Sequence, residues 1–235
     1  MEQYLRMVPE HSKSLLEALS GGQAFTEGQY LFAAADDWLL CVGYPLNGAF
    51  DAESLDKALH AAVSRTKARS CFAIAPEIPA RLKKHAAESD VYFVLHASAP
   101  VPAKLRGPIR RAGLVLRIEE GRSFTAAHRR LWAEFLGGRP LAPRIRQLYA
   151  TVPAALQKSS DLRFLNAWDD ASGRLAACLL MDWSLPGSAS YILGAHSRLC
   201  YVPHAHDLLF AEMLRLARER GREAVLLGLG VNQGI

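Results

Sequence analysis

Side chains that could carry acid–base chemistry gather in one short stretch near the end of the chain. This stretch contains His196, Cys200, Tyr201, His204 and His206. Histidine titrates near neutral pH and can act as a general base, and a tyrosine hydroxyl can act as a general acid. His196 and His204 are therefore candidate bases, and Tyr201 is a candidate acid. The alternative for each is a surface, capping or packed loop residue.

A metal site is a second interpretation of these residues. His204 and His206 are two positions apart, and on a β-strand their rings would point to the same side. Pro203 favours a helix start here instead. Two steps along a helix turn a side chain by about 200°, so the rings would diverge. We therefore expect no metal.

The elements that position these residues can be read from the apolar periodicity. Leu162–Trp168 and Arg174–Trp183 are predicted strands joined by a tight turn, and Ser190–Gly194 is a third strand. A helix is expected over about residues 204–220, where apolar side chains recur at helical spacing and a glycine follows. Ala224–Leu229 is apolar throughout, which indicates a strand buried on both faces and parallel to a neighbour.

The first half of the chain contains a weak copy of this order. The pattern predicts a helix over residues 1–20, strands over 30–35 and 38–43, a helix from 52 to about 67 and a strand over 70–75. Strand, loop, helix and strand over residues 38–75 therefore repeat the order over 190–229. This echo suggests a duplicated half.

The middle of the chain contains the best candidate for a domain boundary. Residues 98–113 are rich in proline and glycine and are read as a connecting segment. It separates an expected domain of residues 1–110 from one of residues 111–235. The other predicted elements are a short helix over 80–87, a buried strand over 91–97, a strand over 114–118, and helices over 123–136 and 143–156.

One stretch resembles a known family. Tyr191-Ile-Leu-Gly-Ala-His, then Tyr201-Val-Pro, then a helix ending Ala-Glu-Met-Leu-Arg-Leu-Ala-Arg-Glu-Arg-Gly221, is similar to the Fem-type branch of the GNAT acyltransferase superfamily. The resemblance implies an α/β (α+β) fold with a GNAT-like mixed sheet flanked by helices. It also implies two GNAT-like halves in tandem, of which the N-terminal half could be degenerate.

The resemblance also implies where substrates would lie. In the GNAT fold the third and fourth core strands splay apart, and the donor lies in the gap with its acyl oxygen held by backbone N–H groups. The donor-binding residues expected here are Leu193, Gly194, Ala195 and Arg198. The acceptor-binding candidates, which lie at strand ends, are Asn166, Trp168, Asp182 and Asn232.

The loop before the crossover helix departs from the acetyl-CoA-dependent pattern. In those enzymes a glycine-rich turn cradles the pyrophosphate. Arg198–Pro203 occupies that place and contains no glycine, which argues against acetyl-CoA binding by this loop. Fem-type relatives also lack the turn and use other donors, including aminoacyl-tRNA. An acyl-CoA or a tRNA-type donor is therefore expected, with a small amine as acceptor.

Charge, apolar runs and cysteine spacing indicate which kinds of partner and location to expect. The net charge of +5 comes with arginine clusters at Arg106–Arg111 and Arg144–Arg146, which could contact RNA or tRNA. No apolar run approaches the roughly 20 residues of a membrane span, and the N-terminus has no signal-peptide pattern, so a cytoplasmic location is expected. The widely spaced cysteines indicate neither disulfides nor zinc.

These observations predict an acyl- or aminoacyl-transferase that moves an acyl group from a CoA or tRNA-type donor to an amine. The histidines and the tyrosine beside the splay favour this function. The alternative is a non-catalytic GNAT-like module that binds or regulates, and the missing glycines of the donor loop favour it.

Overall fold

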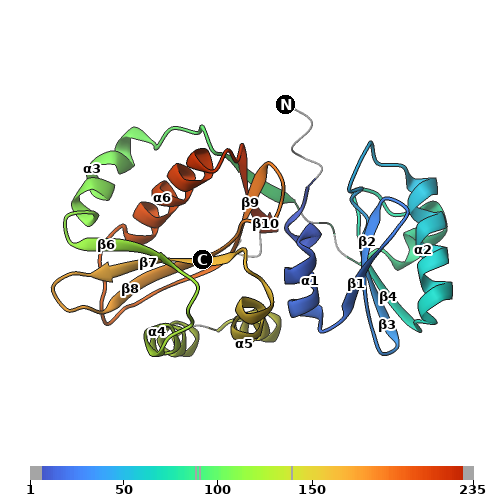
Figure 1. Ribbon diagram of the computed structural model, residues 1–235, viewed down its shortest axis with the longest axis horizontal. Coiled ribbons are helices and arrows are strands. Elements are labelled where there is room, and N and C mark those ends of the chain that lie inside the picture. The colour runs from blue at the N-terminus through green and yellow to red at the C-terminus, as the bar shows by residue number, and fades with distance from the viewer. Residues whose placement is uncertain (1–6, 88, 90, 139, 230–235) are drawn as a thin grey trace. The chain divides into compact units, whose positions relative to one another are not determined.

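The computed structural model describes residues 7–87, 89, 91–138 and 140–229 of the 235-residue chain. The chain forms two compact units that divide between Tyr92 and Phe93, and unit 2 extends from Phe93 to Gly228. The boundary expected at residues 110 and 111 falls inside unit 2. Each unit is built around one β-sheet (Figure 1).

Unit 1 contains a four-stranded sheet with the order β1-β2-β3-β4. The first three strands are antiparallel, and β4 lies parallel to β3 because the chain crosses over through α2 between them. The two strands and the helix expected over residues 30–67 are present. The elements in chain order are η2 Pro9–His11, α1 Lys13–Ser20, β1 Gln23–Glu27, β2 Tyr30–Ala35, β3 Trp38–Val42, α2 Ala52–Thr66, β4 Ser70–Ile74 and η3 Ala80–His85.

Helices cover both faces of this sheet (Figure 1). On one face Leu55 and Leu59 of α2 pack against Phe32 of β2. On the other face Leu16 of α1 packs against Leu31. Both helices are capped at their N-termini by side chains that the sequence provides locally, namely Ser12 for α1 and Asp51 for α2.

Unit 2 contains a six-stranded sheet with the order β5-β10-β9-β8-β7-β6. Strands β7, β8 and β9 are antiparallel, and β10 is parallel to β9 across α6. This is the order and direction of β1 to β4, so the suspected repeat is present. The elements are β5 Tyr92–His96, α3 Ala103–Ala112, β6 Leu116–Gly121, α4 Ala126–Gly137, α5 Pro143–Lys158, β7 Leu162–Asp169, β8 Leu175–Asp182, β9 Ser188–His196, α6 Ala205–Glu219 and β10 Ala224–Leu229.

The second sheet has a pair of helices on each face, where the first has a single helix (Figure 1). α3 and α6 cover one face, where Leu209 and Met213 pack with Leu179 and Met181. α4 and α5 cover the other face, where the Trp132 ring lies 6.1 Å from that of Phe164. Successive side chains of a strand alternate between these two faces.

β5 completes this sheet from a distant part of the sequence. The amide of Ala97, directly after β5, donates to the carbonyl of Glu223, directly before β10, at 2.8 Å. The sequence pattern predicts a buried strand here, but Phe93 is 48% exposed. The reason is that β5 is an edge strand, and its apolar side chains reflect β-propensity rather than burial.

The segment over residues 98–113 is not a plain linker, because it contains helix α3. Pro102 stands at the N-cap, and Pro108 lies inside the helix. An internal proline removes one backbone hydrogen bond and normally ends a helix. Packing of α3 on α6, with Ala112 in the core of unit 2, compensates here.

A buried histidine joins α4 to the sheet. The helix expected from residue 123 begins at Ala126, with Thr125 as its N-cap, and His128 completes the capping box. The amide of Thr125 donates to His128 Nδ1 at 3.2 Å, so Nε2 carries the proton and donates to Asn166 Oδ1 at 2.9 Å. Burial lowers the pKa of His128, although the Asn166 hydrogen bond opposes this.

This arrangement makes stability depend on pH. The pKa of His128 in the folded state is below its unfolded value near 6.5, so its contribution is complete above that pH and is lost as the pH falls. We expect the free energy of unfolding in urea to decrease from about pH 7 to about pH 5, and His128→Gln to reduce that decrease. His11→Gln is the necessary comparison, because burial also lowers the pKa of His11. An unchanged pH slope in His128→Gln would contradict this role.

Candidate active site

The two parallel strands of unit 2 separate after a short paired segment. Pairing of β9 with β10 extends from Ser188 with Ala224 to Ser190 with Leu226. β9 then continues to His196, where it is still paired with β8. A register shift between Leu180 and Met181 leaves one extra residue in β9 at position 192. The described strands thus form the expected splay.

Unit 1 has no equivalent opening among its described residues. β3 and β4 pair along their whole length, from Trp38 with Ser70 to Val42 with Ile74. The amide of Gly43 extends this ladder by donating to the carbonyl of Ile74 at 2.7 Å. Of the two repeated β-α-β units, the second therefore offers the gap.

Gly194 lies on the open part of β9. The amide of Ser197 donates to the carbonyl of Ala176 in β8, and backbone groups alternate in direction along a strand. The amide and the carbonyl of Gly194 therefore face away from β8, whereas those of Leu193 and Ala195 face β8. Of the predicted donor-binding residues on β9, Gly194 is the one whose N–H faces the gap.

Two tyrosines border Gly194. Tyr149 of α5 donates its hydroxyl to the Gly194 carbonyl at 2.5 Å. The hydroxyl of Tyr191 lies 3.1 Å from the point that a Cβ on Gly194 would occupy. Burial raises the pKa of Tyr191 to about 12, so this hydroxyl keeps its proton at neutral pH. Neither tyrosine is marked as a site residue by its neighbours in the sequence.

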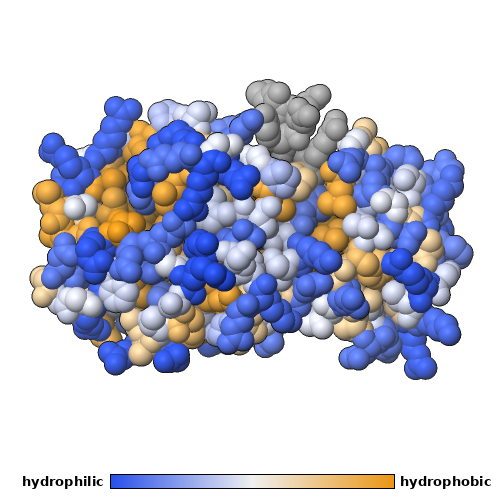
Figure 2. All heavy atoms as spheres, viewed as in Figure 1, coloured by the Kyte–Doolittle hydropathy of each residue, from blue (hydrophilic) through white to orange (hydrophobic). Residues whose placement is uncertain are grey.

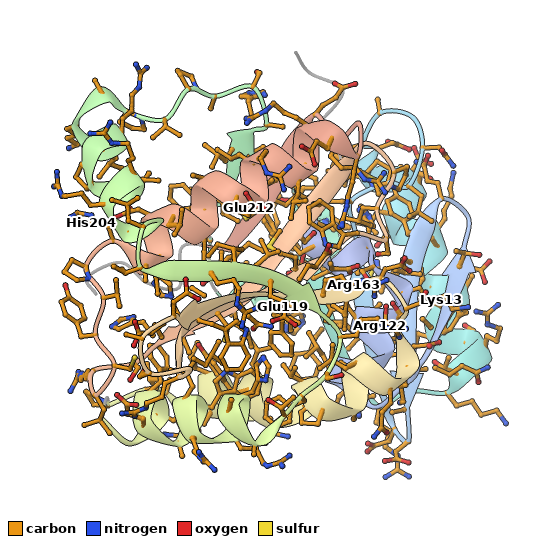
Figure 3. The ribbon with its side chains drawn as sticks, turned by 60° about the vertical axis from the view of Figure 1, so that its left-hand side comes forward. Lys13, Glu119, Arg122, Arg163, His204 and Glu212 are labelled. Carbon is orange, nitrogen blue, oxygen red and sulfur yellow. The ribbon has the colours of Figure 1, made fainter. Side chains whose placement is uncertain are left out.

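Two of the three histidines come together. The rings of His196 and His206 are 5.0 Å apart in an edge-to-face arrangement, and His206 Nε2 donates to the Ala195 carbonyl at 3.2 Å. His204 instead lies at the outer end of α6, exposed, with Nδ1 2.8 Å from Asp207 Oδ2 (Figure 3). Tyr201 is 66% exposed in the preceding loop. The pair that the structure brings together, at the end of β9, is therefore His196 and His206.

A carboxylate accepts the hydrogen bonds of the loop between β9 and α6. Glu134 of α4 accepts hydrogen bonds from the amides of Arg198 and Leu199, the latter at 2.9 Å, and from the Ser197 hydroxyl at 2.9 Å. Burial alone would raise the pKa of Glu134, but these donors and the charge of Arg174 hold it below its usual value. The backbone amides at the place where GNAT enzymes cradle a pyrophosphate are thus occupied from within the chain.

The predicted acceptor-binding residues are spread over the sheet. Asn166 is buried and hydrogen-bonded to His128. Trp168 is half-buried at the end of β7, and Asp182 is fully buried at the end of β8. Asn232 lies outside the described residues.

Neither a metal cluster nor a membrane span is found in the described part of the chain. Its histidines, cysteines and carboxylates form no group of three that could hold a metal ion. None of its helices is both long enough and apolar enough to cross a membrane.

Comparison with known proteins identifies the fold. No protein-family model and no curated protein matches the sequence. FemX matches with 12% identity over 98% of this chain and 85% of its own, at a TM-score of 0.62. L-PGS from Bacillus licheniformis matches with 16% identity over 95% of this chain and 76% of its own, at a TM-score of 0.57. A GCN5-related N-acetyltransferase from Kribbella flavida matches with 13% identity over 94% of this chain and 85% of its own, at a TM-score of 0.51.

At these identities the likeness is one of fold. The chain has a GNAT-like fold related to that of the Fem-type proteins, with two mixed sheets flanked by helices. This confirms the fold that the Tyr191–Gly221 resemblance implied. The site residues remain predictions.

The crowding at Gly194 can be tested. A Cβ there would lie 2.8 Å from Leu179 Cδ2 and 3.2 Å from the Cys178 carbonyl oxygen. We expect Gly194→Ala to lower the free energy of unfolding by about 1–3 kcal/mol, since neighbouring groups must move. The matched control is Gly137→Ala, where no atom beyond the adjacent residues and the backbone of its own helix lies within 4 Å of the new Cβ, and the change should be under about 1 kcal/mol. Equal effects of the two changes would contradict the tight packing at Gly194.

Proposed function

We propose that this protein transfers an acyl or aminoacyl group from an activated ester to an amine, at Gly194 in the gap between β9 and β10. The observation that carries the proposal is the splay itself, because it leaves the Gly194 amide facing an open position on β9. The GNAT-like fold supports a transferase. One structural neighbour is described as the C-terminal domain of a putative lysylphosphatidylglycerol synthetase from Agrobacterium fabrum, a name that describes joining an amino acid to an acceptor.

The groups around Gly194 suit each step of such a transfer. The Gly194 N–H would donate to the oxyanion that forms when the amine attacks the ester carbonyl. His206 or His196 would take the proton from the attacking nitrogen as the new C–N bond forms. As the C–O bond breaks, Tyr191 would give its proton to the leaving oxygen, which suits a hydroxyl whose pKa is about 12. The products are an amide and an alcohol.

The donor that fits best is an aminoacyl-tRNA-type ester. Glu134 already accepts the amide hydrogen bonds of Arg198 and Leu199, so a CoA pyrophosphate would have to displace a carboxylate there. Helix α3 offers exposed basic side chains for a phosphate backbone, among them Lys104, Arg110 and Arg111. Such a donor is consistent with the expected cytoplasmic location.

Removal of the carboxylate should convert the loop into an anion site. We expect Glu134→Ala to bind inorganic pyrophosphate about tenfold more tightly than the natural protein, because two amides and a hydroxyl lose their acceptor. Isothermal titration calorimetry would measure this. Glu119→Ala, an exposed carboxylate on β6, is the control and should change nothing. Equal pyrophosphate binding by the natural protein and Glu134→Ala would show that the carboxylate does not block the loop.

The base assignment has a matched control in the same helix. With a charged tRNA donor and a primary amine, we expect His206→Gln to lower kcat by about 100-fold, a typical loss for a general base. His204→Gln should lower it by less than about threefold, since His204 lies outward against Asp207. Mass spectrometry of the amide product would follow both reactions. Equal losses in the two variants would remove the role of His206.

The non-catalytic module remains the second candidate function, because the filled loop also suits a protein that has lost its donor. It predicts ligand binding without an amide product from either acyl-CoA or aminoacyl-tRNA. Product formation from either donor would exclude it.

A further inference from the structure

Three buried oxygen atoms without hydrogen-bond partners lie beside one another at the closed end of the splay. They are Asp182 Oδ2 and the hydroxyls of Ser188 and Ser190. Asp182 and Ser190 are fully buried, and Ser188 is 4% exposed. Buried polar groups in proteins nearly always have partners, so a cluster without any needs an explanation.

The pairing of the strands brings the three side chains to one face. Asp182 is the register partner of Ser190 across β8 and β9, and register partners share a face of the sheet. Ser188 is two residues from Ser190 on the same strand and therefore lies on that face as well. Asp182 also pairs with Leu162 of β7 on the other side. The three oxygens thus border one small region of the sheet.

A cation with several hydrogen-bond donors would satisfy all three oxygen atoms. Asp182 Oδ1 accepts from the amide of Ser184 at 2.9 Å, which orients the carboxylate and leaves Oδ2 unused. Among the described residues, no lysine, arginine or histidine forms an ion pair with Asp182. A buried carboxylate is costly without a compensating charge. A primary ammonium carries one positive charge and three N–H donors, one for each of the three oxygens.

We propose that Asp182, Ser188 and Ser190 form a binding site for a primary ammonium group of the substrate. This rests on the proposed transfer only for the identity of the molecule that carries the ammonium. Ser190 is the last residue of β9 paired with β10, so the site lies where the two strands part.

The distance to Gly194 defines the role of this ammonium. Ser190 and Gly194 are four residue steps apart along β9. Without the extra residue at position 192 this leaves three steps, or roughly 10 Å at about 3.3 Å per residue. An amine held by Asp182 is too far away to attack a carbonyl at Gly194. The site therefore selects substrates with a second, non-reacting amino group, such as a diamine or a basic amino acid.

Direct binding tests the site without any transfer. We expect pentylamine, titrated by calorimetry or ligand-observed NMR, to bind about tenfold more tightly than either 1-pentanol, which lacks the charge, or pentyltrimethylammonium, which lacks the N–H donors. Asp182→Asn should abolish this preference, and Ser190→Ala should weaken pentylamine binding. Asp170→Asn, an exposed aspartate in the β7–β8 turn, should not. Equal binding of the three probes would overturn the proposal.

The thermal stability of the free protein distinguishes this site from a structural aspartate. Because the described residues give the carboxylate no cationic partner without a ligand, Asp182→Asn should have a Tm equal to or above that of the natural protein. A clearly lower Tm would show that Asp182 stabilises the fold instead. Should Asp182→Asn not be obtained folded, Ser190→Ala with the three probes decides the matter alone.

Failure of this site and failure of the proposed transfer are separable. Pentylamine binding that depends on Asp182, with no amide product from any donor, would contradict the transferase and leave the site standing. Conversely, if transfer occurs, the KM for a diamine acceptor should rise about tenfold in Asp182→Asn while kcat is little changed. An unchanged KM for the diamine would overturn the site alone.

Discussion

The parting of β9 from β10 after Ser190 is the constraint on which the rest of unit 2 depends. A parallel pair that stayed together would satisfy the Gly194 amide and carbonyl with strand hydrogen bonds, as β3 and β4 do around Gly43 in unit 1. Because the strands part, those groups need other partners. Tyr149 supplies one by donating to the Gly194 carbonyl from α5. The N–H of Gly194 lies on the same side, whereas in the described part of unit 1 the amide of Gly43 is paired with the carbonyl of Ile74.

Glu134 of α4 provides the acceptor for the backbone amides of the loop that follows Gly194. The loop that enters α6 has the form of an anion site, with successive amides and a hydroxyl directed to one point, but it holds a carboxylate from α4. The loop is thereby held in shape without a bound phosphate. A preorganised loop and a bound cofactor phosphate would compete for the same donors, which links the choice of donor to a residue in a different helix.

The parts of the fold that were predictable are those whose signals are local. The tight turn before Arg174, the crossover from β9 through α6 to β10 and the helix from residue 52 were all evident from adjacent residues. α3 was hidden because Pro102 and Pro108 are typical of loops, and only its packing on α6 makes the helix stable. Local sequence cannot report such tertiary compensation.

The candidate site likewise contains residues that the local sequence indicates and residues that it does not. The histidine-rich stretch and Gly194 could be found because they adjoin the recognisable strand and helix. Tyr149 and Glu134 reach the same place from α5 and α4, and nothing in their neighbourhood marks them. Which of His204 and His206 points toward β9 depends on where α6 begins. It begins at Ala205 rather than at Pro203, so His204 is the N-cap residue and His206 lies in the first turn.

The edge strand β5 makes the folding of unit 2 depend on the order in which the chain is synthesised. β5 leaves the ribosome before any other strand of its sheet, while its neighbour β10 is the last, with more than a hundred residues between them. A nascent chain must hold β5 without this neighbour until β10 has been made, and such long-range pairing is slow to form. A fragment that started at the proline-rich segment would lack the strand altogether and expose the edge of β10.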